Sequence, residues 1–405
     1  MHPLRAWRLV VLLTATLWCA AWAHAQGVVV AMGGAVKDDS PMWAEVVRLA
    51  GGPGARFVVF TMSSEDPDAS AAALLRQVAR HGAKAEHVRV GPRFNAAGLA
   101  ASERDAPWLQ AVRSAQGALF SGGDQSLITQ TLAPGGEPTP LLLALREMVQ
   151  RGGVVAGSSA GAAVMSRRMF TGGNPLEVMK GTQAGETVAA GLGFIGADVL
   201  VDQHFLKRGR IGRLLPTLQR EGLVLGLGVD EDSGIVVRGE DVEVIGSRGA
   251  LLVDLRSAQH DRSLSEFNIR GAVLSYLEAG DRLNLASLAV TPAPAKAAGR
   301  AVAPPPANFR PYWSGPVFFA DMLSDFTIVS AMQQLVDSRR TEVTGLAFHA
   351  LAGAGERKAD LGFEWILSRG PDTAAWNVGD RYSIAQVQLE VRPVRVARPL
   401  FTPWR

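Results

Sequence analysis

The sequence predicts an α/β fold with a mostly parallel central sheet flanked by helices. Between Gln26 and about residue 255, short β-branched runs alternate with longer helix-like stretches, which is the pattern of successive βαβ units. Several of the expected strands end in glycine or acidic residues. In open α/β sheets the ligand crevice lies at the carboxyl ends of the strands, so we expect the chemistry of this protein at one edge of the sheet.

The expected elements follow in chain order. Strands are predicted at 28–30, 56–61, 87–90, 118–121, 154–156, 199–201 and 224–229, and helices at 68–81, 139–151 and 160–165. After Asp230 the pattern changes to short runs separated by turns, at 234–237, 242–245 and 250–255. This change predicts an antiparallel extension of the sheet.

The first 25 residues are typical of a secretory signal peptide. Arg5 and Arg8 precede an apolar run, and Ala23-His24-Ala25 provides small residues for cleavage before Gln26. We therefore expect a secreted or periplasmic protein. The apolar run is too short to span a membrane and no later segment reaches about 18 uninterrupted apolar residues, so no integral membrane segment is predicted.

Composition narrows the possible functions. Cys19 is the only cysteine and lies within the predicted signal, so the mature protein has no thiol for a disulfide, a nucleophile or a metal site. Without Arg5 and Arg8 the formal charge falls from +3 to +1, with 39 basic against 38 acidic residues. That balance argues against nucleic acid as a partner. The sequence has no zinc or calcium motif, and we expect no metal or organic cofactor.

The remaining chain divides into three parts. Residues 26–290 form the expected catalytic domain. Residues 291–308 are rich in proline and alanine with few large apolar groups, which predicts a semi-rigid linker without a core. Residues 309–405 are dense in aromatic residues and then alternate in polarity, which predicts a small α+β accessory domain of unknown role.

The nucleophile candidate is Ser159, within Gly157-Ser158-Ser159-Ala160-Gly161. This stretch follows an apolar run and precedes a helix-like run, so the serine stands at the apex of a strand, tight turn and helix, as in a nucleophile elbow. The helix amino terminus offers N–H groups and a positive dipole to an oxyanion. A plain glycine-rich turn, with Ser158 capping the helix, is the alternative reading.

A serine nucleophile needs a base, and His204 is the best-placed histidine. It lies in Asp202-Gln203-His204-Phe205, where the strand predicted at 199–201 opens onto the crevice. A purely structural histidine is the alternative. The other histidines after the signal lie in basic turns, a charged loop or the tail; they are His81, His87, His260 and His349.

A third, acidic member must orient the imidazole. Asp230, Glu231 and Asp232 end the next apolar strand, and the pattern does not choose among them or exclude a solvated turn. The turn Gly122-Gly123-Asp124-Gln125 also ends a strand, so the N–H of Gly123 could join that of Ala160 in an oxyanion hole.

Basic residues follow His204 in the stretch QHFLKRGRIGR. If it is helical, Arg210 and Arg213 share a face while Arg208 points elsewhere. A solvated basic face is the default interpretation. Beside a catalytic histidine, however, guanidinium groups can bind carboxylates through two hydrogen bonds each, which indicates an acidic substrate.

Five stretches together resemble the cyanophycinases, which belong to the serine peptidase family that also includes α-aspartyl dipeptidase. They span roughly residues 27–280 and are the opening strand with Gly33-Gly34, SGGDQ at 121–125, GSSAGAAVMS at 157–166, DQHFLKRGRIGR at 202–213 and GVDEDSGIVV at 228–237. The sequence departs from the family pattern at Ser158, where threonine is frequent, and in the long tail.

This resemblance implies a class I glutamine amidotransferase-like fold and a triad of Ser159, His204 and Glu231. It implies a homodimer, and a substrate pocket shaped by Gln125, Asp202, Gln203, Arg208, Arg210 and Arg213. The implied substrate is cyanophycin, a polyaspartate whose side-chain carboxyls each carry an arginine, and the implied products are β-Asp-Arg dipeptides. Two other functions fit the same residues: a related serine peptidase for other acidic or isoaspartyl peptides, or a noncatalytic binding protein on this fold.

Overall fold

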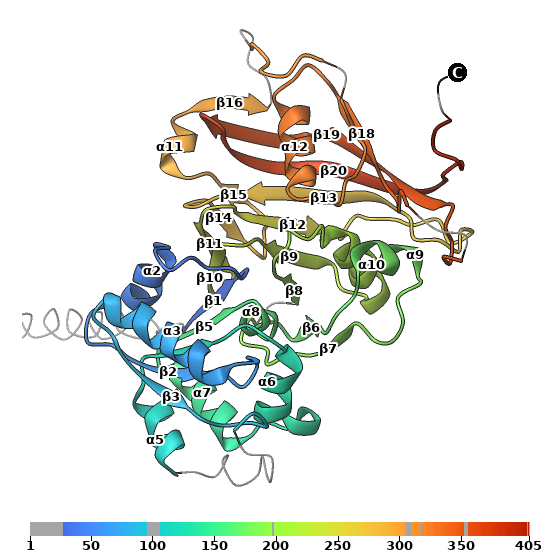
Figure 1. Ribbon diagram of the computed structural model, residues 1–405. Coiled ribbons are helices and arrows are strands. Elements are labelled where there is room, and N and C mark those ends of the chain that lie inside the picture. Colours follow the sequence, from blue (N-terminus) through green and yellow to red (C-terminus); the bar gives the residue numbers. More distant parts are fainter. Residues whose placement is uncertain are drawn as a thin grey trace, which may run out of the picture.

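The computed structural model describes residues 27–94, 106–196, 198–303, 309–315, 317–351, 355–402 and 404 (Figure 1). The predicted signal peptide lies outside the described residues, as do residues 304–308 of the predicted linker. Within the described ranges, the strands form two nine-stranded sheets and one two-stranded antiparallel sheet.

The first sheet has the order β15-β14-β11-β10-β1-β5-β4-β2-β3. Strands β1, β5, β4, β2 and β3 run parallel, while β10, β11, β14 and β15 pair antiparallel. Their bounds are β1 (Val28–Met32), β2 (Arg56–Phe60), β3 (Lys84–Val88), β4 (Gly117–Phe120), β5 (Val154–Ser158), β10 (Ser233–Arg238), β11 (Asp241–Gly246), β14 (Arg282–Asn284) and β15 (Val290–Thr291). The predicted parallel core is confirmed, and so is its antiparallel extension at β10 and β11. The third stretch predicted in that extension, 250–255, belongs to the second sheet instead.

Helices cover both faces of the parallel strands, and this explains why the central strands β1, β5 and β4 are almost entirely apolar. Val28, Val30 and Met32 pack on the face covered by α2 and α3. Val29 and Ala31 pack on the opposite face, against α5, α6, α7 and α8. The helices are α2 (Met42–Leu49), α3 (Pro67–Arg80), α5 (Ala106–Ser114), α6 (Gln125–Leu132), α7 (Pro140–Gln150) and α8 (Ala160–Ala163).

The second sheet has the order β17-β18-β19-β20-β13-β12-β9-β8, with β16 paired to β19. Its bounds are β8 (Val199–Asp202), β9 (Leu225–Val229), β12 (Ala250–Asp254), β13 (Ile269–Leu277), β16 (Arg300–Ala303), β17 (Phe318–Phe319), β18 (Glu342–Ala347), β19 (Leu361–Val378) and β20 (Arg381–Arg395). The strands preceding His204 and Glu231, β8 and β9, therefore belong to this sheet. The expectation that all the chemistry lies on one edge of one sheet is wrong, because the candidate site lies where two sheets meet.

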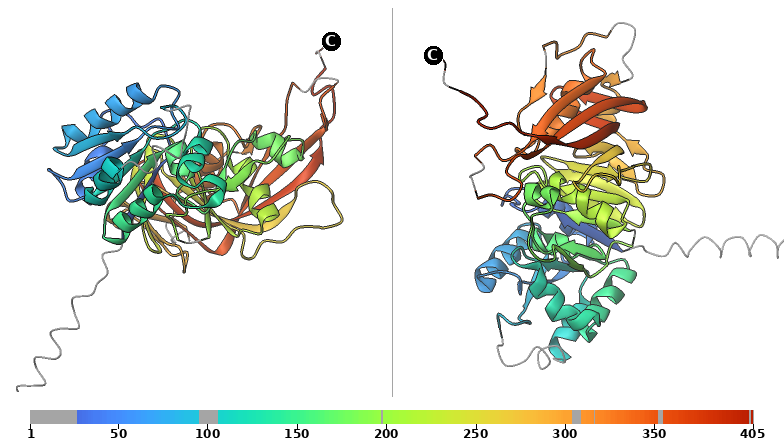
Figure 2. Two further views of the ribbon diagram at one scale, coloured as in Figure 1. Left: turned by 90° about the horizontal axis from the view of Figure 1, so that it is seen from below. Right: turned by 90° about the vertical axis from the view of Figure 1, so that its right-hand side faces the viewer.

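The C-terminal region, residues 309–404, lies at the end of the molecule opposite the parallel strands (Figures 1 and 2). It does not form a sheet of its own, because β20 pairs antiparallel with β13 of the catalytic region, residues 27–290. Helix α12 (Thr327–Val336) packs against β18, β19 and β20. Several aromatic side chains of this region lie in a core shared with the catalytic region, including fully buried Phe363 and Trp365.

The proline- and alanine-rich segment also contributes structure. It contains α11 (Pro294–Ala297) and β16, and Val302 is fully buried. Lys296 is buried too, with its Nζ 2.6 Å from Asp281 Oδ2. The expectation that this stretch has no part in a core is therefore wrong for residues 294–303. Among the described residues, no helix combines the length and apolar character required to cross a bilayer.

Candidate active site

Ser159 stands at a strained turn between β5 and α8. Its φ of +54° and ψ of −109° lie outside the usual regions for a residue with a side chain. The turn closes tightly, since a Cβ on Gly157 would lie 2.2 Å from the carbonyl oxygen of Gly161. Ser158 is the last residue of β5, so it does not occupy the position that caps α8. Ser159 occupies that position, and its side chain forms no capping hydrogen bond. The geometry is that of a nucleophile elbow.

Two further side chains continue from Ser159 in a hydrogen-bonded series. The Oγ of Ser159 is 3.0 Å from Nε2 of His204, and Nδ1 of His204 is 2.7 Å from Oε1 of Glu231. His204 is 8% exposed, while the Glu231 side chain is 23% exposed. The structure thus brings together the three residues that the resemblance implied.

The loop after β1 holds all three segments in place. Carbonyl oxygens of Met32, Gly33 and Gly34 accept hydrogen bonds from the backbone N–H groups of Ser159, His204 and Asp232, at 3.0, 2.7 and 2.9 Å. Gly34 has a φ of +101°, and a Cβ there would lie 2.3 Å from the His204 Nε2. In the sequence, the pair Gly33-Gly34 after a predicted strand was the only sign that this loop holds the three catalytic segments together.

The structure separates the three consecutive acids that the pattern left equivalent. Asp230 is fully buried and accepts from the backbone N–H of Lys207 and from Nε of Arg248. Asp232 accepts from the hydroxyl of Ser247, in the turn after β11. Glu231 is the one whose carboxylate contacts the imidazole.

Burial lowers the pKa of His204 below its usual value, and the positive charges of Arg208 and Arg210 lower it further. The hydrogen bond that the imidazole donates to Glu231 raises the pKa of His204 but does not outweigh both effects. A lowered pKa leaves the imidazole neutral at neutral pH, which is the form that can accept a proton from Ser159.

Arg210 and Arg213 do share a face, and both contact Asp202. The guanidinium of Arg213 pairs with this carboxylate through Nε at 2.8 Å and Nη2 at 2.6 Å, and its Nη1 donates to carbonyl oxygens of the loop after β6 (Arg168–Phe170). With 3% exposure, Arg213 is buried and links Asp202 to this loop, so any part it has in shaping the pocket is through these two contacts.

Arg210 and Arg208 differ from Arg213 in exposure. Nη1 of Arg210 donates to the carbonyl oxygen of Gln203 at 2.7 Å, and burial lowers the pKa of Arg210 to about 10. Arg208 is exposed and lies in the turn directly after His204. The Oε1 of Gln203 is 3.5 Å from Ser159 Oγ, so this predicted pocket residue lies beside the candidate nucleophile.

The predicted oxyanion donors flank Ser159. Ala160 is the first residue of α8, a position whose N–H has no acceptor within the helix. The Gly122-Gly123 turn approaches from the other side, since a Cβ on Gly122 would lie 3.3 Å from the Ser159 Cβ. Gln125 lies further along and donates from Nε2 to the carbonyl oxygen of Phe170 at 2.6 Å, so it anchors the loop after β6.

Sequence reasoning missed a contact between this site and the C-terminal region. Asp325 forms ion pairs with Lys207, at 2.8 Å, and with Arg248, which also pairs with buried Asp230. The guanidinium of Arg248 lies 5.4 Å from the ring centroid of Phe326. The partners in this contact are at least 77 residues apart in the chain, so no local pattern joins them. The many aromatic residues of the C-terminal region were the only sign in the sequence that this region packs against another part of the protein.

A protein family and several known proteins are similar to this chain in sequence. The family model described as Peptidase family S51 matches residues 64–245. A cyanophycinase of Trichormus variabilis is 34% identical over 192 residues, which are 45% of this chain and 61% of that protein. The chain thus covers less than two thirds of that relative.

A cyanophycinase of Synechococcus elongatus shows a longer match. It is 31% identical over 277 residues, which are 64% of this chain and 80% of that protein. Among solved structures, a peptidase from an acI-B1 Actinobacterium is similar with a TM-score of 0.46 and 20% identity, over 64% of this chain and 96% of that one. On the sequence matches, the chain belongs to peptidase family S51.

Proposed function

We propose that the protein is an exported serine-type exopeptidase that hydrolyses cyanophycin to β-Asp-Arg dipeptides. The observation that carries the proposal is the hydrogen-bonded series from Ser159 through His204 to Glu231 at a strained strand-to-helix turn. Family membership and the cyanophycinase relatives support the choice of reaction and substrate. The predicted signal peptide supports export.

In this proposal, the Oγ of Ser159 attacks a backbone carbonyl of the polyaspartate chain while His204 Nε2 takes its proton. Glu231 keeps the proton on Nδ1 and stabilises the imidazolium that forms. The N–H groups of Ala160 and Gly123 bind the oxyanion of the tetrahedral intermediate. His204 then gives its proton to the leaving amine, and water hydrolyses the acyl-enzyme by the same route.

The charges around the site fit the proposed substrate. Each unit of the polymer bears a free carboxylate and a guanidinium group. Exposed Arg208 and partly exposed Arg210 can bind the carboxylate, because guanidinium groups pair with carboxylates through charge-assisted hydrogen bonds. Gln203, beside Ser159 Oγ, can hydrogen-bond the peptide at the cleavage point.

The test is incubation of the purified protein with insoluble cyanophycin, followed by mass spectrometry of the soluble products. We expect β-Asp-Arg from the native protein and none from a Ser159→Ala variant that retains its thermal unfolding midpoint. Loss of a triad nucleophile costs on the order of a million-fold in kcat. Equal release by both proteins would contradict the triad. If neither protein released β-Asp-Arg, the substrate would instead be another acidic or isoaspartyl peptide, or the protein would be a noncatalytic binding protein.

A further inference from the structure

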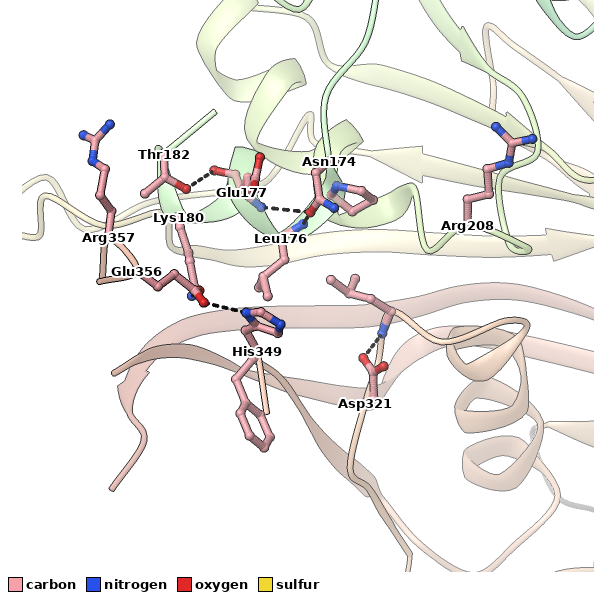
Figure 3. A pocket seen from close by; sticks show the side chains of 13 residues that line it. Asn174, Leu176, Glu177, Lys180, Thr182, Arg208, Asp321, His349, Glu356 and Arg357 are labelled. Atoms are coloured by element: carbon pink, nitrogen blue, oxygen red, sulfur yellow. Dashed lines mark hydrogen bonds and ion pairs between the residues drawn. The ribbon is translucent and has the colours of Figure 1, made fainter. Parts of the chain in front are cut away.

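A cleft of about 560 Å³ lies between the catalytic region and the C-terminal region (Figure 3). Helix α9 (Pro175–Lys180) and its flanking turns form one wall, and Arg208 lies at the end of this wall. The facing wall comes from Asp321, Leu323 and the segment around His349. The cleft exists only because the C-terminal region packs against α9.

An ion pair holds the two walls together. The Nζ of Lys180, whose side chain is 2% exposed, is 3.0 Å from Oε1 of Glu356. The Nδ1 of His349 is 2.6 Å from Oε2 of Glu356, and the Nζ of Lys358 donates to the carbonyl oxygen of Lys180 at 2.9 Å. Because these groups satisfy one another, the cleft is preformed and the charge of Glu356 is balanced within the protein.

Other charges remain exposed in the cleft. Within the described part of the chain, the side chains of Arg208, Arg357 and Glu177 form neither hydrogen bonds nor ion pairs. Asp321 is exposed as well, and among the described residues its carboxylate accepts only from Leu323 and Ser324 in the turn that follows it. Cations and anions in one cleft match a ligand that carries both signs of charge.

Apolar side chains lie between these charges. Leu176, Leu323 and Phe348 line the cleft. Such side chains can pack on the methylene stems of long charged groups while the charged ends reach polar partners. A peptide with arginine on its side chains has this combination of stem, cation and free carboxylate.

The cleft adjoins the candidate active site. The backbone N–H of Arg208 donates to the carbonyl oxygen of His204 at 3.1 Å. On the same wall, the carbonyl oxygens of Gly172 and Gly173, just before α9, accept from Arg213, which holds Asp202. Arg208, which lines the cleft, therefore belongs to the same turn as His204.

We propose that this cleft is a subsite for substrate units next to the scissile bond, one that the C-terminal region completes. Arg208 binds a carboxylate of the acidic peptide, and Glu177 and Asp321 bind its guanidinium groups. The subsite gives a preference for chains with arginine on consecutive units. This inference rests on the proposed function, because it extends the same substrate beyond the cleaved unit.

The test compares two synthetic aspartyl peptides of equal length. One carries arginine on every side chain, and the other carries it only on the unit to be released. A Glu177→Gln, Asp321→Asn double variant keeps side-chain shape and removes both charges. We expect its KM for the fully substituted peptide to rise about tenfold, with kcat unchanged and with wild-type kinetics on the singly substituted peptide.

Asp372→Asn is the matched control, since it removes an exposed acid of the C-terminal region outside the cleft and leaves both KM values unchanged. Wild-type KM in the double variant would overturn the proposal. If the wild type cleaves neither peptide, the proposed function fails, and the cleft is tested by calorimetric binding of the fully substituted peptide to Ser159→Ala. Affinity that does not depend on Glu177 and Asp321 would then overturn the subsite.

Discussion

The His204 imidazole lies against a position that has no room for a side chain. Gly34→Ala would place a Cβ 2.3 Å from Nε2 at a φ of +101°. We expect the ring to be displaced from Ser159 and kcat to fall at least about 100-fold, since misplacement by about 1 Å is enough for such a loss. The control is Gly51→Ala, with a similar φ of +109° but nothing within 4 Å of the added Cβ. Equal losses of kcat in the two variants would contradict the assignment.

The lowered pKa of His204 sets the acid limb of activity. Only the neutral imidazole accepts a proton, so kcat/KM should rise with pH through a pKa below 6.5 and reach its plateau by neutral pH. Because the charge of Arg208 contributes to this lowering, Arg208→Gln should move the limb to higher pH. The measurement is the pH profile of kcat/KM for both proteins. An unmoved limb would show that Arg208 acts only on binding.

Elements differ in how well the sequence predicts them. The central strands were predictable because burial on both faces makes them apolar throughout. The start of edge strand β3 was predicted three residues late, because exposed Lys84 and Glu86 alternate there with half-buried positions and leave no apolar run. The sequence could not predict that β8 and β9 belong to a second sheet, because an apolar run shows that a strand is buried but not which strands it pairs with. Glu231 could not be separated from its neighbours, since turn geometry decides which carboxylate faces His204.

At the scale of elements, the turn before α12 supports the loop that carries His204. Asp325→Asn removes ion pairs to Lys207 and Arg248, and the latter also holds Asp230 next to Glu231. We expect kcat to fall several-fold with little change in KM, and stability to fall by about 1 kcal/mol or less because Asp325 is 38% exposed. Steady-state kinetics and thermal unfolding check this. Asp360→Asn, which removes an exposed pair with Arg395, should change neither.

At the scale of the whole molecule, the catalytic region cannot be separated from the C-terminal region at residue 290. Truncation there would remove β20, which pairs with β13, and would expose Leu274 and Tyr276, now buried. An unpaired, apolar strand edge promotes aggregation. We therefore expect the truncated protein to be insoluble or aggregated by size-exclusion chromatography.

The control removes residues 400–405, where Phe401 is 82% exposed and Trp404 fully exposed, and should leave solubility and hydrolysis unchanged. A soluble, monodisperse protein ending at residue 290 with wild-type kinetics would contradict the shared sheet. It would also remove the structural basis for the cleft, since Asp321 and Glu356 would be absent. The C-terminal region is therefore expected to serve folding and substrate binding together, because the surface that continues the sheet also provides one wall of the cleft.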